Sequence, residues 1–335
     1  MGYHFKNLVF EGGGVKGIAY VGAMKVLEEK GIIPSITRVG GTSVGAINAL
    51  LFALGFDNSQ QRKILWELNF NNLLDASWLI PNVLRVLNRY GWYKGDYFQE
   101  WVSKLIQEKT GTASTTFRDL REAKKPDLYV YGTNLSTHYS EVFSIEHSPD
   151  MRLADAVRIS MSLPIFYTAI RNTRNDVYVD GGLLDNYPVK LFDREKYVAS
   201  EKLKTDYYEK QNAIFLKDHP DSSPYVFNKE TLGFRLDSKE EIAGFRYNEP
   251  QVNKIDHFFE YSQALIKTIL DSQSNTHIHG DDWQRTIYID TLGVSTTDFS
   301  LSDDMKRALE DSGKKGAEAY FTWFDDPASH PVNRP

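Results

Sequence analysis

The chain has 335 residues, enough for one large α/β domain or two small ones. Its hydrophobic share of 41% and its charged share of 25% are ordinary for a soluble globular protein. The formal net charge of −6 argues against a broad electrostatic hold on nucleic acid, so no nucleic-acid partner is expected. The sequence has no cysteine, which excludes disulfides, thiolate metal sites and a cysteine nucleophile.

The sequence also carries no pattern that predicts a membrane span. The longest apolar stretch, residues 46–56, is too short to cross a bilayer and contains Asn48. The first ten residues lack the apolar core of a secretory signal. Together with the absence of cysteine, this predicts a cytoplasmic protein whose membrane contact, where it occurs, is peripheral.

Strand and helix patterns alternate at the start of the chain. Residues 7–11 predict a strand, 17–30 a helix, 36–39 a second strand, and 44–54 a strongly apolar helix. Short loops between them predict parallel strands with a right-handed crossover. The apolar helix indicates burial between layers, as in an α/β/α sandwich.

The rest of the chain shows one change of character, near residue 195. Before it, the patterns predict helices and an aromatic loop within 60–110, strands at 128–133, 140–145 and 176–180, and a helix at 153–162. After it come a charged stretch, an amphipathic pattern at 255–270, a strand at 286–290 and a helical tail at 302–323. We expect residues 1–195 to form a catalytic core and residues 196–335 to complete or elaborate the same domain.

The leading candidate for chemistry is Ser43, in the run Gly41-Thr42-Ser43-Val44-Gly45. This G-x-S-x-G pattern is typical of a sharp strand-to-helix turn that lifts a serine hydroxyl out of the backbone. Its place between an expected strand and an apolar helix favours a nucleophile over a chance match. Since serine alone is a poor nucleophile, it needs a nearby base and a site for the oxyanion.

A glycine-rich turn, residues 12–17, follows the first expected strand and opens a helix. Bare amides at a helix N-terminus stabilise a negative oxygen, which favours an oxyanion hole formed by Gly13 and Gly14. The dinucleotide pattern G-x-G-x-x-G also fits, but the second strand ends without the carboxylate that binds ribose. A phosphate-binding loop would need Ser or Thr after Lys16, where the sequence has Gly17. A structural turn without a ligand is the remaining alternative.

The most suitable base is Asp180, which ends the apolar run Val177-Tyr178-Val179 and precedes two glycines. None of the eight histidines falls at an equally apolar strand end. The glycines allow the chain to turn away while the carboxylate stays in place, although an aspartate here also suits an ordinary turn. With a reference pKa near about 4, an aspartate works as a base when desolvation raises its pKa.

These blocks, in this order, make the chain resemble the patatin-like phospholipases, serine acyl hydrolases with a Ser–Asp dyad. Residues 12–17 match the G-G-G-x-R/K-G block, residues 41–45 match G-x-S-x-G, and residues 180–182 match D-G-A/G. Three further segments resemble the family, so the likeness covers about residues 7–190; they are residues 91–101, 156–164 and 182–189. Lys16 stands where many members have Arg, a change that keeps the charge but loses the planar fork.

The resemblance implies a role for each matched residue. Ser43 would be the nucleophile and Asp180 the base. The expected oxyanion-hole amides are those of Gly12, Gly13, Gly14 and Val44. The expected supporting residues are Val15, Lys16, Gly17, Gly41, Gly45, Gly181 and Gly182. The implied fold is a three-layer α/β/α patatin-like fold with a central, mostly parallel sheet, and no metal or other cofactor is implied.

The resemblance further implies a phospholipid or lysophospholipid substrate, cleaved through an acyl-enzyme at a transient membrane contact. The aromatic loop from Trp78 to Trp92 and the amphipathic segment from Ile255 to Leu270 are candidates for that contact. Core packing explains the second segment as well. Other readings are hydrolysis of neutral lipids or other esters, a nucleotide-binding Rossmann-like protein, and a binding module with an inactive dyad. The sequence does not specify an oligomeric state.

Overall fold

The computed structural model describes residues 2–68, 82–237, 281–296 and 298–326, with residue 328 and four short stretches between 255 and 269. The strands are β1 (Asn7–Phe10), β2 (Arg38–Gly41), β3 (Gly91–Tyr93), β4 (Asp127–Asn134), β5 (Tyr139–Ser144), β6 (Ile165–Tyr167), β7 (Ile170–Arg171), β8 (Val177–Asp180), β9 (Thr231–Asp237) and β10 (Thr286–Asp290). The α-helices are α1 (Ala19–Glu29), α2 (Val44–Leu54), α3 (Asn58–Glu67), α4 (Asn82–Arg89), α5 (Asp96–Thr110), α6 (Phe117–Glu122), α7 (Leu153–Ser160), α8 (Gly182–Asp185), α9 (Asp206–Asp218) and α12 (Asp303–Asp325). The 3₁₀ helices are η1 (Gly14–Ile18), η2 (Ile33–Ser35), η4 (Glu195–Tyr197) and η6 (Asp281–Arg285).

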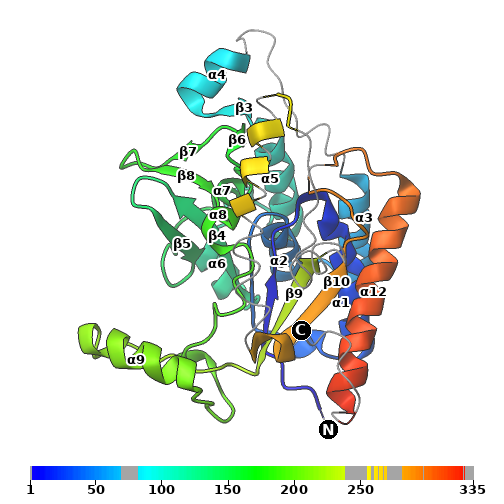
Figure 1. Cartoon of the computed structure of the whole chain (residues 1–335), viewed down its shortest axis with the longest axis vertical. Helices are drawn as coiled ribbons and strands as arrows, with labels where there is room; N and C mark the ends of the chain where they lie inside the picture. The colour runs from blue at the N-terminus through cyan, green and yellow to red at the C-terminus, as the bar shows by residue number, and fades with distance from the viewer. Residues whose placement is uncertain are drawn as a thin grey trace.

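One mixed sheet runs through the molecule, in the order β10-β9-β1-β2-β4-β8-β7, with β5 also paired to β4 (Figure 1). The pairs from β10 through β4 are parallel, whereas β5, β7 and β8 pair in antiparallel fashion. The predicted α/β fold with a central, mostly parallel sheet is therefore confirmed.

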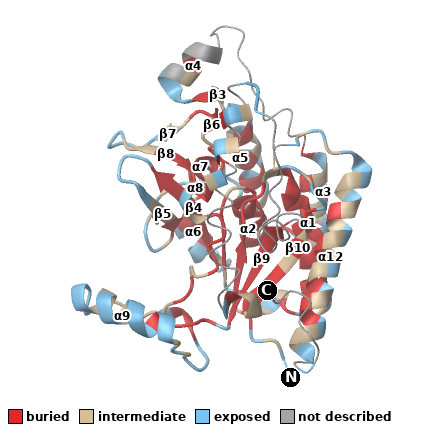
Figure 2. Ribbon diagram, viewed as in Figure 1, coloured by how far each residue is buried: buried red, intermediate tan, exposed pale blue. Residues whose placement is uncertain are grey.

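Helices pack on one face of this sheet because alternate strand residues point there. Leu8 and Phe10 of β1 share a core with α1, α2, α7 and α12, and every residue of α2 is buried. Figure 2 shows the buried residues concentrated around α2 and the central strands of the sheet. On the opposite face Val9 and Tyr129 pack against Phe192 and Tyr197, in the segment that follows α8.

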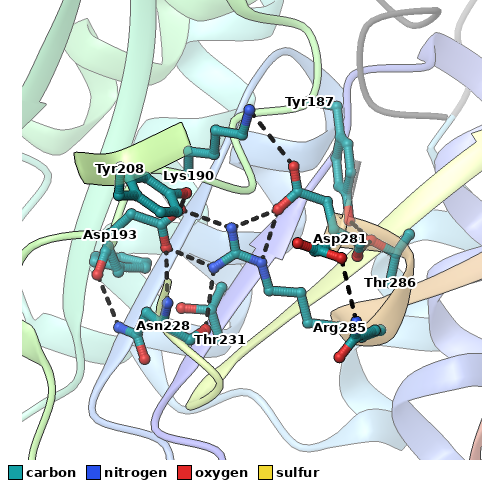
Figure 3. A network of polar contacts seen from close by, with 12 residues as sticks. Tyr187, Lys190, Asp193, Tyr208, Asn228, Thr231, Asp281, Arg285 and Thr286 are labelled. Atoms are coloured by element: carbon teal, nitrogen blue, oxygen red, sulfur yellow. Dashed lines mark hydrogen bonds and ion pairs between the residues drawn. The ribbon is translucent and has the colours of Figure 1, made fainter. Parts of the chain in front are cut away.

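Residues after 195 add two strands to this sheet, because β9 pairs with β1 and β10 pairs with β9. A buried polar network joins this later part of the chain to Asp193, which lies just before residue 195 (Figure 3). Arg285 Nη2 donates to Asp193 Oδ2 at 2.7 Å and to Asp282 Oδ1 at 2.6 Å. All three side chains are buried, and Arg285 Nη1 also donates to Asn228 O at 3.0 Å.

Two parts of the second half were not predicted. Strand β9 was missed because Arg235 and Asp237 give it a charged sequence, yet both are buried and their side chains pair at 2.7 Å. Helix α9 lies in the charged stretch and projects from the body of the molecule, with Ile214 70% exposed (Figure 1). Among the described helices, none combines the length and apolar content needed to cross a bilayer.

Candidate active site

Ser43 lies in the turn between β2 and α2, as the motif predicted. Its backbone is at φ 55° and ψ −126°, a left-handed conformation that is costly for a residue with a Cβ. The flanking glycines make the turn possible. A Cβ on Gly41 would lie 2.5 Å from the backbone of Gly45, and one on Gly45 would lie 2.3 Å from Phe10 O.

Asp180 lies near the carboxyl end of β2, at the end of a strand that runs in the opposite direction. β8 is antiparallel to β4, and Asp180 pairs with Gly132 of β4, two residues from Val130, the partner of Gly41. The chain then turns into α8, where the N–H of Gly182 donates to Asp180 Oδ1 at 2.8 Å. Asp180 Oδ2 is buried and has no hydrogen-bond partner within the described part of the chain.

Burial dominates the electrostatics of Asp180, whose side chain is cut off from water. Desolvation raises its pKa to about 7, while the hydrogen bond from the Gly182 N–H and the nearby Ser43 hydroxyl lower that pKa only in part. A carboxyl group with this pKa is about half ionised near neutral pH. It is a far stronger base than an aspartate in water.

The Ser43 hydroxyl lies near enough to Asp180 to lower the pKa of that carboxyl, and it donates a hydrogen bond to Met161 Sδ at 3.6 Å. A thioether is a weak acceptor, so the second contact is easily given up. Catalytic hydrogen bonds are commonly loose in the absence of substrate.

The glycine-rich turn leads from β1 into η1, beside Ser43. Gly12 donates its N–H to Asn186 O at 3.0 Å, so this amide is occupied. Gly14 and Val44 are the first residues of η1 and α2, positions whose N–H groups have no partner within the helix. Within the described residues, no carbonyl accepts the N–H of Gly13, Gly14 or Val44.

Buried ionisable groups lie behind this turn. Glu11 Oε2 accepts the N–H of Leu236 at 2.6 Å, and its Oε1 accepts from Asn186 Nδ2 at 3.2 Å. Burial raises the pKa of Glu11 to about 8, although the positive charges of Arg235 and Lys16 act in the opposite direction. Among the described residues, no group of three or more His, Asp or Glu side chains is placed to hold a metal ion.

The sequence model of the patatin-like phospholipases matches residues 8–193. The chain belongs to this family. It is 31% identical over 327 residues to the uncharacterized protein YqhO of Bacillus subtilis, covering 93% of this chain and 97% of that protein. It is 26% identical over 188 residues to the probable lipid hydrolase 463L of Invertebrate iridescent virus 6, covering 56% and 63%. Its fold is similar to that of VipD from Legionella pneumophila, with a TM-score of 0.57, 18% identity, and 95% and 67% of the two chains covered.

All three patatin-like blocks thus meet near the carboxyl ends of β1 and β2. Four residues of the site were given no role from the sequence: Leu236, Asn186, Ser160 and Met161. Asn186, Ser160 and Met161 fall inside segments that resembled the family, but a single sequence does not reveal which residues they contact. Leu236 is 225 positions from its partner Glu11, so no local pattern links the two.

The predicted membrane-contact segments are only partly described. Trp78 and residues 79–81 lie outside the described residues, as do five of the sixteen residues in 255–270. Of the rest, Tyr90 is 48% exposed, and the Arg85 Nη1 donates to Trp92 O at 2.5 Å. Ile255 and Leu265 are also exposed.

Proposed function

We propose that this protein is a lipid acyl hydrolase that cleaves carboxylic esters of phospholipids or lysophospholipids with Ser43 as nucleophile and Asp180 as base. Family membership supports the lipid substrate class. The observation that carries the chemistry is a strained serine turn beside a buried aspartate, one of whose oxygens has no hydrogen-bond partner among the described residues.

In the proposed reaction, Ser43 Oγ attacks the ester carbonyl while its proton passes to Asp180 Oδ2. The carbonyl oxygen becomes an oxyanion that accepts hydrogen bonds from the amides of Gly13, Gly14 and Val44. Gly12 is left out because its N–H is occupied by Asn186. Loss of one such donor typically lowers the rate about 100- to 1000-fold.

Collapse of the oxyanion breaks the ester C–O bond, and Asp180 returns the proton to the departing alkoxide. The acyl group now sits on Ser43. A water molecule attacks it, gives one proton to Asp180, and releases the fatty acid as that proton returns to Ser43 Oγ. A single carboxyl group with a pKa near neutrality serves both steps, because it accepts and releases a proton at small cost.

The lipid must leave a membrane or micelle to reach Ser43, and we propose a transient peripheral contact through the aromatic loop at 78–92. Polar replacement of Trp78 and Leu79 should then lower activity on phospholipid vesicles far more than on a soluble short-chain ester. Equal losses on both substrates would rule out docking by this loop.

The decisive test of the reaction combines labelling and product analysis. The purified protein is treated with a fluorophosphonate probe, and its products from defined phospholipid and lysophospholipid vesicles are identified by mass spectrometry. Ser43→Ala should abolish both labelling and fatty-acid release, and Asp180→Asn should lower both by several orders of magnitude, with the fold intact by circular dichroism. Wild-type protein that releases no fatty acid, or a Ser43→Ala variant with wild-type rate, would overturn the proposal.

A further inference from the structure

One short turn contacts both proposed catalytic residues. It consists of the last residue of α7 and the two that follow, Ser160, Met161 and Ser162. Ser160 Oγ accepts the backbone N–H of Ser43 at 2.9 Å. Ser162 O accepts the backbone N–H of Asp180 at 2.9 Å. The nucleophile and the base, 137 positions apart, are therefore hydrogen-bonded to residues only two apart in the chain.

The contact with Ser160 falls where the backbone most needs support. Ser43 holds a strained conformation, and such strain persists only where the surroundings enforce it. As the N-cap of α2, Ser43 cannot donate its N–H within the helix. Ser160 is fully buried, so loss of its hydroxyl would leave the Ser43 N–H without that acceptor in a region closed to bulk solvent.

The turn is itself held firmly. Arg158 Nη1 donates to Ser162 Oγ at 2.6 Å, and the Ser162 hydroxyl donates to Arg158 O at 2.8 Å. The other end of the Arg158 guanidinium donates to Lys94 O at 2.5 Å, which ties α7 to the loop before α5. Ser160 therefore offers its oxygen from a rigid element, as a positioning group must.

We propose that Ser160 is a positioning residue for the nucleophile: its hydroxyl accepts the Ser43 N–H and so keeps the Ser43 side chain aimed at the substrate carbonyl and at Asp180. This inference rests on the proposed function. It assigns Ser160 no contact with substrate. Its effect is on the rate at which Ser43 is acylated, because small displacements of a nucleophile cost on the order of 100-fold in rate.

The test compares Ser160→Ala and Ser160→Thr with Ser144→Ala. Ser144 is a matched control: it is fully buried, and its hydroxyl accepts a backbone N–H, that of Glu146 at 3.2 Å, away from the site. For each protein one measures the second-order rate of fluorophosphonate labelling, kcat and KM on a soluble ester, and Tm. Ser160→Cys is added as a near-isosteric variant with a weaker acceptor, in case the extra methyl of Thr overpacks the site.

Ser160→Ala should lower the labelling rate and kcat on the order of 100-fold with KM unchanged, and Thr should restore most of that loss. If Tm shows that Thr overpacks, Cys should give a rate between Ala and wild type. Ser144→Ala should lower Tm and leave the labelling rate unchanged. A Ser160→Ala variant that labels at the wild-type rate would overturn this inference alone. A wild-type protein that neither labels nor hydrolyses would instead overturn the proposed function.

Discussion

Asn186 and Gly12 are joined by two hydrogen bonds: the Gly12 N–H donates to Asn186 O at 3.0 Å, and Asn186 Nδ2 donates to Gly12 O at 3.3 Å. The same amide also reaches the buried Glu11 carboxyl. The turn that supplies the proposed oxyanion donors is thus held by the residue after α8, the short helix that follows the proposed base.

Replacement of this amide should loosen the turn. We expect Asn186→Ala to lower kcat on a soluble ester by about 10- to 100-fold with little change in KM, because the Gly13 and Gly14 amides lose their alignment. Asn134→Ala is the control, since Asn134 is also buried but its side chain donates to Glu141 in the β4–β5 hairpin. Equal rates in the two variants would show that the turn does not depend on Asn186.

Activity should depend on pH through Asp180. Because its pKa is raised to about 7 and the base must be ionised, kcat/KM should rise as pH increases through about 7 and then level off. Glu11 titrates nearby, so Glu11→Gln is measured beside the wild type. The rise should remain in Glu11→Gln; its loss there would assign the titration to Glu11.

The same shift predicts a stability effect. The folded pKa of Asp180 lies above 3.8, the ordinary value for an aspartate, so the folded state binds the proton more tightly than the unfolded state. The contribution of this group is full below pH 4 and is lost as pH rises from about 4 to about 7. Asp180→Asn removes the buried charge, and its Tm relative to wild type should therefore be higher at pH 8 than at pH 4. A constant difference in Tm would contradict a raised pKa.

Arg285 compensates two buried carboxylates, so its loss should be costly. Arg285→Met is expected to lower the free energy of unfolding by about 3–5 kcal/mol, because Asp193 and Asp282 remain buried without it. Arg118→Met removes an exposed ion pair with Asp150, which water and salt screen, and should cost far less. Denaturant unfolding of both variants checks this, and similar values for the two would contradict it.

Helices α1 and α12 cross at two glycines, and a methyl group there should separate them. A Cβ on Gly313 would lie 1.8 Å from Ala19 O, and one on Gly22 would lie 1.9 Å from Glu310 O. Helix propensity favours Ala over Gly by about 1 kcal/mol, whereas overpacking costs about 1–3 kcal/mol or more. Because the obstacle is a backbone oxygen that cannot turn aside, Gly313→Ala should destabilise the protein. A variant more stable than the wild type would show that the two helices do not approach each other so closely.

The first half of the fold could be predicted because its signals are local. The apolar run at 44–54 became α2 with the same bounds, and the strand predicted at 286–290 is β10. β9 could not be predicted in this way, since Arg235 and Asp237 interrupt its apolar pattern and are nevertheless buried, where their side chains pair with each other. The helix predicted at 153–162 ends at Ser160, where the chain turns toward the site.

The site could be predicted in its motifs but not in its connections. Ser43 and Asp180 each stood out by sequence context, whereas the occupied amide of Gly12 follows from a contact across 174 positions. The catalytic roles of Ser43 and Asp180, and the division of the chain at residue 195, stay predictions.

The pairing of β9 with β1 has a practical consequence for anyone who trims the protein. A recombinant fragment that stops near residue 195, where the family match ends, would leave β1 as an open sheet edge and Asp193 without its counter-ion. Such a fragment should be prone to self-association. Its failure to hydrolyse lipid would not test the roles of Ser43 and Asp180, both of which it still contains.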